Sequence, residues 1–279
     1  MSLGILTNVA ATYAENNLNQ TQGSLQTVLQ QLSSGSRINS GADDAAGLSI
    51  ADGLHANEAA LTQSAQNAQN GVGLLQTADG ALSQVTNLLD RAVTLATEAA
   101  NGGLTTAQST AADTEFQSIL TEIGNIGTST NFNSTAVFSA TATDFVVSDG
   151  TTSGTTTISA TIGALSSSNI GAGTGVDLST SDLTSQANAK TAINNITTAI
   201  ADVAAQRGAI GANINQLNAA ANVASSEQVN LSAAESSIRS TNYGQATSDL
   251  AKFQVLSQTG ISALAQANSV QQEILKLLQ

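Results

Sequence analysis

The chain of 279 residues contains no cysteine, no proline and no tryptophan, and His55 is its single histidine. Without cysteine there can be no disulfides, no thiolate metal ligands and no cysteine nucleophile. One imidazole is too few for a histidine-rich zinc site or for a mechanism that uses two histidines. We therefore expect no cofactor, no metal site and no catalytic residues, and we interpret His55 as a structural or exposed side chain.

The lack of proline favours long helices. Proline averages about 5% of residues in ordinary proteins, and it interrupts helices because it removes a backbone donor and clashes one turn back. A chain without it can form very long helices. Aromatic residues make up only 3% of the chain, which predicts thin layers of small side chains, as in a rod, rather than a bulky globular core.

Basic residues are also scarce. Seven Lys and Arg stand against 20 Asp and Glu, which gives a formal net charge of −13. This charge repels phosphate backbones and acidic membrane surfaces, so we expect neither nucleic acid nor a membrane as partner. No stretch reaches the roughly 18 apolar residues of a membrane span. The first basic residue is Arg37, so we expect a chain that stays in the cytoplasm or leaves without a cleaved signal peptide.

Apolar residues recur at helical spacing on both sides of the middle of the chain. A heptad seam over residues 3–32 predicts a helix that packs against another helix. A longer repeat from about Asp44 to Ala100 predicts a helix on the order of 85 Å long. Shorter patterns predict helices from about Thr110 to Ile126, from Asn188, and from Tyr243 to the end. The residues of the long repeat are Leu54, Leu61, Ala68, Leu75, Leu82, Leu89 and Ala96.

Residues from about 128 to 185 are dominated by Ser, Thr and Gly. The segments Asp144–Val147 and Thr156–Ile162 flank the turn signal Ser148-Asp149-Gly150, which predicts a β-hairpin. We therefore expect a mainly α fold: a long antiparallel, coiled-coil-like helical rod formed by the N- and C-terminal zones. A small appendage that contains the hairpin would lie in the middle of the chain, at the far tip of the rod.

Both terminal helices carry apolar residues away from their seams. A pair of helices can bury one stripe on each helix, so the surplus indicates an association surface. The near absence of charge on these helices agrees with that interpretation. If copies share the surplus stripes head to tail, the contact is heterologous and can build an open helical filament. The surplus residues are Leu6, Val9, Tyr13, Leu29, Val255, Ile261, Leu275 and Leu278.

Several motifs resemble those of one protein family. The segment Gln31–Ala51 closely resembles the N-terminal signature of bacterial flagellin, as do Asn67–Gly71 and Gln76–Leu82. Near the other end, Arg207–Asn213 and Ala263–Asn268 resemble the C-terminal motifs of the family. The resemblance also includes the closing residues 274–278, and it covers about residues 1–138 and 186–279.

The resemblance implies a structural subunit that polymerises with itself into the flagellar filament for swimming motility. Residues 1–42 and 241–279 would form the inner core, 43–127 and 186–240 the helical rod, and 128–185 a β appendage facing solvent. Family members are secreted unfolded through the flagellar type III export channel. An export chaperone, the filament cap and hook-junction proteins are the implied partners, and the extracellular filament is the implied location.

Three groups of residues are candidates for function. Arg37, Asp43 and Asp44 form a charged cluster that predicts either a bend between two rod layers, pinned by charge and available for subunit contacts, or a solvated loop. Arg91 and Glu115 match two positions of a Toll-like receptor epitope in the family, although Val93 and Thr94 replace the charged residues expected beside Arg91. The residues expected to mediate subunit assembly are Leu6, Leu18, Leu25, Leu29, Leu32, Leu256, Leu264, Ile274, Leu277 and Leu278.

Alternatives remain at this level. The main rival function is a surface-displayed adhesin or polysaccharide-binding protein on the same scaffold, with the middle region as its binding face. A minor flagellin or a junction protein between hook and filament is another reading. The middle region itself is either a plain soluble cap or an O-glycosylated surface. An enzyme ranks far below these, because side chains able to do chemistry are almost absent.

Overall fold

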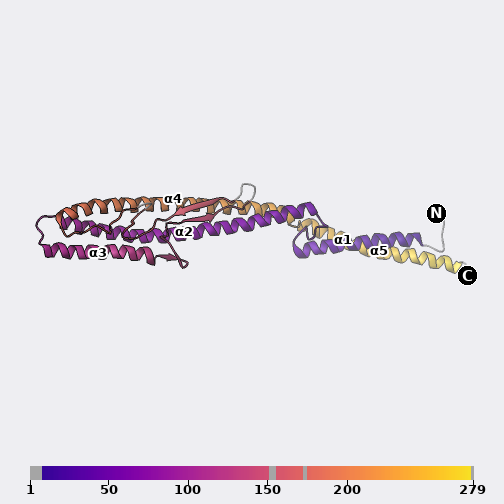
Figure 1. Cartoon of the computed structure of the whole chain (residues 1–279). Coiled ribbons are helices and arrows are strands. Elements are labelled where there is room, and N and C mark those ends of the chain that lie inside the picture. Colours follow the sequence, from indigo (N-terminus) through magenta and orange to yellow (C-terminus); the bar gives the residue numbers. More distant parts are fainter. Residues whose placement is uncertain (1–7, 151–154, 172–174, 278–279) are drawn as a thin grey trace. The chain divides into compact units, whose positions relative to one another are not determined.

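The computed structural model describes residues 8–150, 155–171 and 175–277. Long helices dominate it, and short strands occur only in the middle of the described chain (Figure 1). This confirms the predicted mainly α fold with a small strand-containing central region. The helices are α1 (Val9–Ser34), α2 (Ala45–Ala99), α3 (Thr106–Ser129), α4 (Gln186–Arg239) and α5 (Tyr243–Leu277), and the strands are β1 (Asn131–Phe132), β2 (Thr135–Ala136), β3 (Ala142–Val146) and β4 (Thr157–Thr161).

The chain forms two compact units. Unit 1 comprises residues 1–56 and 230–279, and unit 2 comprises residues 57–229. None of the described helices is both long enough and apolar enough to cross a membrane.

In unit 1, α1 and α5 lie antiparallel. Near one end of the pair the Gly35 carbonyl accepts a hydrogen bond from Thr241 N at 3.0 Å. Near the other, Asn8 Nδ2 donates to the Ala267 carbonyl at 2.9 Å. Asn8 also caps α1, because its side-chain oxygen accepts from Ala11 N at 3.0 Å. These bonds fix the register of the two helices.

Gly35 ends α1 in the left-handed conformation, with φ 71°. Its N–H bonds the Gln31 carbonyl at 2.9 Å, as in a C-capping turn. A β-carbon at this position would also lie only 2.9 Å from the Tyr243 hydroxyl. The left-handed backbone conformation therefore favours glycine, and a larger residue would also have to displace the exposed Tyr243 ring.

In unit 2, α3 turns back along α2, and α4 runs antiparallel to α2 (Figure 1). The residues of the long heptad repeat that belong to this unit are all buried, as the repeat predicts. They meet one apolar face from each neighbouring helix. These faces are Phe116, Ile119, Leu120 and Ile123 of α3, and Ile196, Val203, Ile210 and Leu217 of α4.

The predicted hairpin is present as the antiparallel pair β3–β4, in which Phe145 stands opposite Ile158. A second, shorter pair, β1–β2, has no counterpart in the sequence prediction. Its two-residue turn consists of Asn133 and Ser134, with φ 49° and 63°. Positive φ at both central residues is the type I′ pattern, and Asn-Ser is a weaker signal for it than Asn-Gly.

From the sequence we expected the central region at the far tip of the helical rod. The structure does not place it there. Residues 100–105, which join α2 to α3, form that end of unit 2 instead. The central region packs along the helices: Ser64 Oγ of α2 donates to the Ser148 carbonyl at 2.7 Å. Its apolar residues enter the core of the unit because α3 returns the chain alongside α2 before the strands begin. The buried central residues are Val137, Phe138, Ile158, Ala160, Ile162, Leu165, Ile170, Leu178 and Leu183.

Candidate functional site

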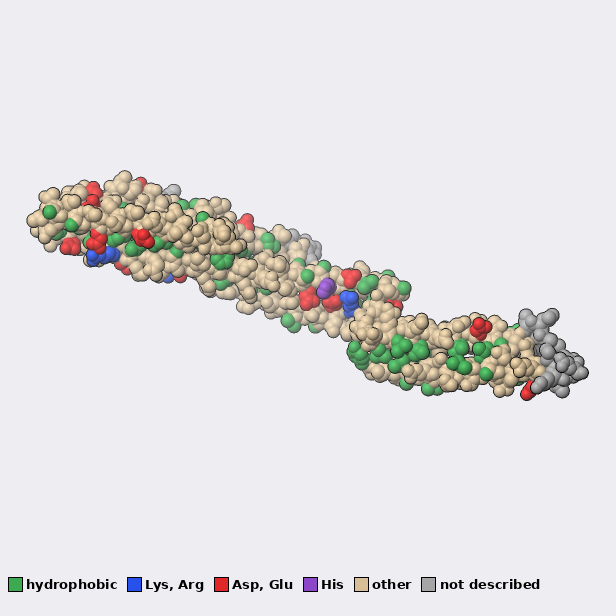
Figure 2. Space-filling view, turned by 90° about the horizontal axis from the view of Figure 1, so that it is seen from below, with side chains coloured by type: hydrophobic (Ala, Val, Ile, Leu, Met, Phe, Trp, Pro, Cys, Tyr) green, Lys and Arg blue, Asp and Glu red, His purple; other side chains and the backbone are tan. Residues whose placement is uncertain are grey.

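The α1–α5 pair buries few of its apolar side chains. Among the described α1 residues only Val28 is buried, although the helix carries a continuous heptad seam. Two helices side by side cover one stripe each, so the remaining apolar residues stay in contact with solvent. Figure 2 shows hydrophobic side chains gathered along this pair. We call the exposed large apolar residues of α1 and α5 the terminal apolar face; they are Val9, Tyr13, Leu29, Tyr243, Val255, Leu256, Ile261 and Val270.

The three most exposed members of this face each have more than half of their surface exposed. Tyr13 is 69% exposed, Val255 65% and Val9 59%. Scattered exposed apolar residues are normal, and Ile50, Val223 and Val229 are exposed elsewhere, but most of the exposed large apolar residues of the described chain gather on α1 and α5, which is a mark of an interaction site.

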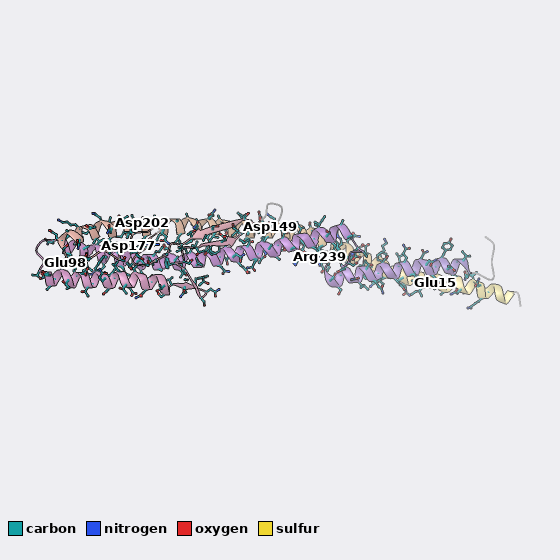
Figure 3. All side chains as sticks on the ribbon, viewed as in Figure 1. Glu15, Glu98, Asp149, Asp177, Asp202 and Arg239 are labelled. Atoms are coloured by element: carbon teal, nitrogen blue, oxygen red, sulfur yellow. The ribbon has the colours of Figure 1, made fainter. Side chains whose placement is uncertain are left out.

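The terminal apolar face carries little charge. Glu15 is the single charged residue of α1 (Figure 3). On α5 the charged residues are Asp249, Lys252, Glu273 and Lys276. The scarcity of charge lowers the desolvation cost of covering this surface.

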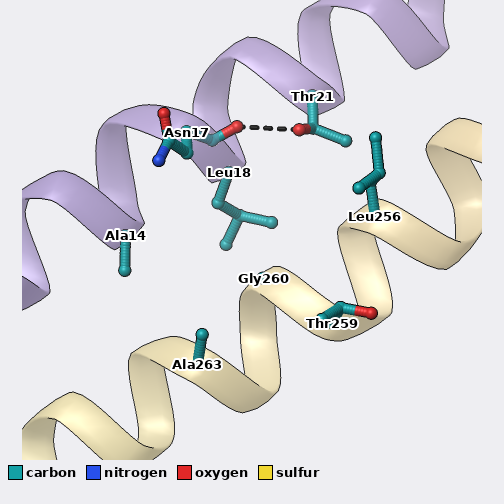
Figure 4. A pocket seen from close by; sticks show the side chains of 8 residues that line it. All are labelled: Ala14, Asn17, Leu18, Thr21, Leu256, Thr259, Gly260 and Ala263. Atoms are coloured by element: carbon teal, nitrogen blue, oxygen red, sulfur yellow. Dashed lines mark hydrogen bonds between the residues drawn. The ribbon is translucent and has the colours of Figure 1, made fainter.

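A groove of about 220 Å³ opens between the two helices. Leu18 of α1 lies above Gly260 of α5, where a β-carbon would stand 3.2 Å from Leu18 Cδ1 (Figure 4). Leu18 therefore occupies the space that a side chain at residue 260 would need, and the rest of the groove stays open. The lining residues are Ala14, Asn17, Leu18, Thr21, Leu256, Thr259, Gly260 and Ala263.

The residues predicted for subunit assembly fall into three groups. Leu29 and Leu256 are exposed, at 47% and 44%. Leu18, Leu25, Leu32 and Leu264 are half-buried between the helices. Leu6 and Leu278 lie outside the described residues, as do the side chains of Ile274 and Leu277.

The spacing of apolar residues does not correctly predict which residues of α5 are buried against α1. Apolar residues spaced three and four apart predict the helix from Tyr243 to the end, and Leu256 and Val270 belong to this series together with Leu250, Phe253 and Leu264. Leu256 and Val270 are nevertheless exposed. The spacing has no means of showing that Gly260 lies opposite Leu18, because this depends on the register between α1 and α5. The sequence signal that could have pointed to the groove is a glycine inside a helical pattern, which often has a packing reason.

The segment between α1 and α2 contains the predicted charged cluster. Arg37 Nη2 donates to the Ile238 carbonyl at 2.7 Å, and Arg37 N donates to the Arg239 carbonyl at 2.7 Å. None of the ion pairs found among the described residues joins Arg37 to Asp43 or Asp44. The expectation that charge pairing pins this segment is therefore wrong, since the arginine holds backbone carbonyls instead.

The two aspartates organise the backbone around them. Asp43 Oδ2 accepts from Asn39 N at 3.0 Å and from Ser40 N at 2.8 Å. These amides lower the pKa of the Asp43 carboxyl below its ordinary value, with the Asn39 bond the larger cause. Asp44 Oδ1 accepts from Gly47 N at 2.8 Å and so caps the start of α2.

His55 and Arg239 meet on the same carboxylate in unit 1. His55 Nδ1 lies 3.4 Å from Glu235 Oε2, and Arg239 Nη1 lies 3.4 Å from Glu235 Oε1. The His55 side chain is largely exposed. Its placement agrees with a structural or exposed histidine.

Arg91 and Glu115 face each other across α2 and α3 in unit 2. Arg91 Nη2 lies 2.7 Å from Glu115 Oε1, and Arg91 Nε donates to the same oxygen at 2.8 Å. Both side chains are about half exposed. The pair is therefore accessible on the surface of unit 2.

Two family models match this chain. The bacterial flagellin N-terminal helical region matches residues 5–143, and the bacterial flagellin C-terminal helical region matches residues 193–278. Together they include α1, α2, α3 and α5 and most of α4.

Curated relatives align along nearly the whole chain. A flagellin of Halalkalibacterium halodurans is 32% identical over 271 residues, which cover 97% of this chain and 98% of the relative. Flagellin FlaB2 of Treponema pallidum is 31% identical over 286 residues, with the same coverage of 97% and 98%.

Among solved structures, a flagellar hook-associated protein from Vibrio parahaemolyticus is similar with a TM-score of 0.59. The similarity covers 71% of this chain and 100% of that one at 18% sequence identity, so it supports the fold alone. Because both terminal family models match and a flagellin aligns from end to end, the chain belongs to the bacterial flagellin family.

Proposed function

We propose that this flagellin joins the filament through its terminal apolar face, with identical copies stacked head to tail. The chain is a structural subunit of the flagellar filament, as its family membership establishes. The observation that carries the proposal is the exposure of Val9, Tyr13 and Val255 on a pair of nearly uncharged helices. The rival function of an adhesin or polysaccharide-binding protein has no support in the relatives.

The energetics favour burial of this face in a polymer. Fully burying a Val, Leu or Ile side chain contributes about 1.5–3 kcal/mol. The terminal apolar face offers several such residues, and association costs an estimated 4–15 kcal/mol in lost freedom of motion. Contact over the whole face can offset that cost, whereas contact at one residue cannot.

The proposal assigns a role to each part of the chain. Residues 1–42 and 241–279 form the inner core of the filament, where the apolar face is covered. Residues 43–127 and 186–240 form the rod. Residues 128–185 form the outer part, with polar side chains facing solvent and apolar side chains packed in the core of unit 2.

The implied partners follow from the family. We propose that a flagellar chaperone holds the chain before type III export, and that it polymerises beneath the filament cap onto hook-junction proteins. The working location is the extracellular filament, where the homologous flagellins are found. Secretion can be followed directly: deletion of the export apparatus should leave the chain inside the cell.

Seeded polymerisation tests the assembly surface. Purified chain is added to filament fragments, and growth is followed by sedimentation and electron microscopy. We expect Val255→Asp and Ile261→Asp to prevent growth, because each places an unpaired charge in the covered face. Val146→Asp on β3 is the matched control, since it adds the same charge to an exposed valine in the region proposed to face solvent.

Circular dichroism of each variant shows whether the monomer still folds. Normal growth of the Val255 and Ile261 variants would contradict the assembly surface. Removal of either terminal helix should likewise abolish growth, whereas binding by an adhesin would survive it.

A further inference from the structure

The dipeptide Asn-Gly occurs twice in the chain, as Asn70-Gly71 and as Asn101-Gly102. In this dipeptide the glycine backbone nitrogen can attack the side-chain carbonyl carbon of asparagine, because no β-carbon on the glycine obstructs the approach. A new C–N bond closes a five-membered succinimide, and ammonia leaves. Water then opens the ring at either carbonyl, which yields aspartate or isoaspartate. The reaction needs no enzyme, but it needs a backbone free to bring the two groups together.

Asn101 and Gly102 lie in the loop between α2 and α3 of unit 2, and both are exposed. Asn101 N donates to the Glu98 carbonyl at 3.1 Å. Among the described residues, none forms a hydrogen bond with the Asn101 side-chain amide or the Gly102 N–H. A second glycine, Gly103, follows in the same loop. The attacking and attacked groups are therefore free of competing bonds.

Hydrogen bonds hold this loop at both of its ends, outside the dipeptide. At its far end Thr105 N donates to Gln108 Oε1 at 2.8 Å. At its start Gln186 Nε2 of α4 donates to the Ala100 carbonyl at 3.0 Å, one residue before the dipeptide. A β-carbon on Gly102 would lie 3.3 Å from the same Gln186 Nε2. This side chain is long and exposed, so it can move aside.

The other Asn-Gly dipeptide, Asn70-Gly71, lies in a helix rather than in an exposed loop. Both residues lie inside α2, where the glycine N–H takes part in the helical hydrogen-bond ladder. Gly71 is also buried: a β-carbon there would lie 2.9 Å from Leu217 Cδ1 and 2.9 Å from Phe145 Cδ1. Ring closure at Asn70 would require that this part of the helix open first.

We propose that Asn101 is a site of spontaneous deamidation in the folded protein, whereas Asn70 is protected by α2. The net change at Asn101 converts one amide and one water into a carboxylate and an ammonium ion, so each modified copy gains one negative charge. That charge appears beside the C-terminus of α2, where the helix dipole is also negative. The isoaspartate product adds a methylene to the backbone in a loop with two glycines, which can absorb it.

The test follows both sites in one sample. The full chain is kept in mildly alkaline buffer, folded or in concentrated urea, and then digested with a protease that cleaves after glutamate. The peptide over residues 99–115 contains Asn101 as its only asparagine, and the peptide over residues 59–98 contains Asn70. Mass spectrometry gives the rate of amide-to-acid conversion, and a labelling reaction with isoaspartate methyltransferase identifies the isoaspartate product.

In urea the two Asn-Gly sites should react at similar rates. On folding, we expect the Asn70 rate to fall on the order of tenfold or more, and the Asn101 rate to change by less than about threefold. Asn101→Gln and Gly102→Ala should both suppress conversion in the 99–115 peptide. Equal protection of the two sites on folding, or unchanged conversion in these variants, would overturn the proposal.

Discussion

Arg207 of α4 donates two hydrogen bonds to the Asp79 carboxylate of α2. Nε donates to Oδ1 at 2.7 Å, and Nη2 donates to Oδ2 at 3.3 Å. The hydrogen bond to the carboxylate raises the pKa of the Arg207 guanidinium above its already high ordinary value, and burial opposes it. Two parallel bonds fix direction as well as distance, so the pair sets the register of α4 against α2.

We expect Arg207→Ala to lower the free energy of unfolding by about 0.5–1 kcal/mol, because the pair is partly exposed and water screens it. Arg207→Lys should recover little of this, since an ammonium cannot make the forked contact. Arg91→Ala is the control, because the Arg91–Glu115 pair is more exposed. Urea unfolding followed by circular dichroism measures both. A larger loss for Arg91 would argue against a register role for Arg207.

Two glycines one turn apart on α3 should respond in opposite ways to alanine. A β-carbon at Gly127 would lie 1.9 Å from the Leu165 carbonyl oxygen, whereas Gly124 has no neighbouring atom within 4 Å. Alanine is the better helix former by roughly 0.5–1 kcal/mol, so Gly124→Ala should raise the melting temperature. Gly127→Ala should instead cost about 1–3 kcal/mol, because the central region must shift away from α3.

Thermal unfolding of the two variants gives the comparison directly. A gain in stability for Gly127→Ala would mean that residues around Leu165 are not packed on α3 in solution.

The start of α4 should lose stability in acid. The pKa of Asp182 is lowered by the Thr184 hydroxyl, and further by the Asn188 amide. A carboxyl with a lowered pKa in the folded protein contributes stability that is present above its unfolded pKa of about 3.9 and is lost as the pH falls through the folded value. We therefore expect Asp182→Ala to be less stable than the wild type near neutral pH.

The difference should shrink as the pH drops below about 4. Urea unfolding midpoints measured across this range provide the test. A constant difference between Asp182→Ala and the wild type at every pH would contradict the assignment.

The sequence was sufficient to predict which residues are buried where a heptad repeat lies on a regular helix. Leu75, Leu82 and Leu89 are predicted to face a partner helix because they recur every seven residues, and all three are fully buried. The same logic located the exposed Tyr13 and Val255, since they fall outside the seam. These predictions need only the helical period and a count of how many stripes a helix pair can cover.

The sequence was insufficient where two distant segments must meet in one register. The close approach of Leu18 to Gly260 depends on how far α1 slides along α5, and that of the Leu165 carbonyl to Gly127 depends on where the central region lies on α3. The charged cluster was misread for a similar reason. Arg37 has acids nearby in sequence, but its partner is the Ile238 carbonyl, about 200 residues away.

Because Arg37 bonds a backbone carbonyl rather than an acidic side chain, a test of this residue must measure the protection of the backbone around it. If the guanidinium acts by holding a carbonyl, Arg37→Ala should expose the segment around residues 35–44 while the monomer stays soluble. Loss of a hydrogen bond from a charged donor costs about 1.5–3 kcal/mol in general, and less at an exposed site such as this one. We therefore expect hydrogen exchange at the Arg37 and Thr241 amides, which bond the Arg239 and Gly35 carbonyls, to accelerate on the order of tenfold.

The same variant should polymerise more slowly, because the segment links α1 to the rest of unit 1. Arg37→Lys separates the two explanations. It keeps the positive charge next to Asp43 and Asp44, but a lysine ammonium lacks the planar fork and the length to reach the Ile238 carbonyl in the same way. Full recovery of exchange protection and filament growth with lysine would mean that charge alone is sufficient. Partial or no recovery, together with normal solubility, is the result that the hydrogen bond from Arg37 Nη2 predicts.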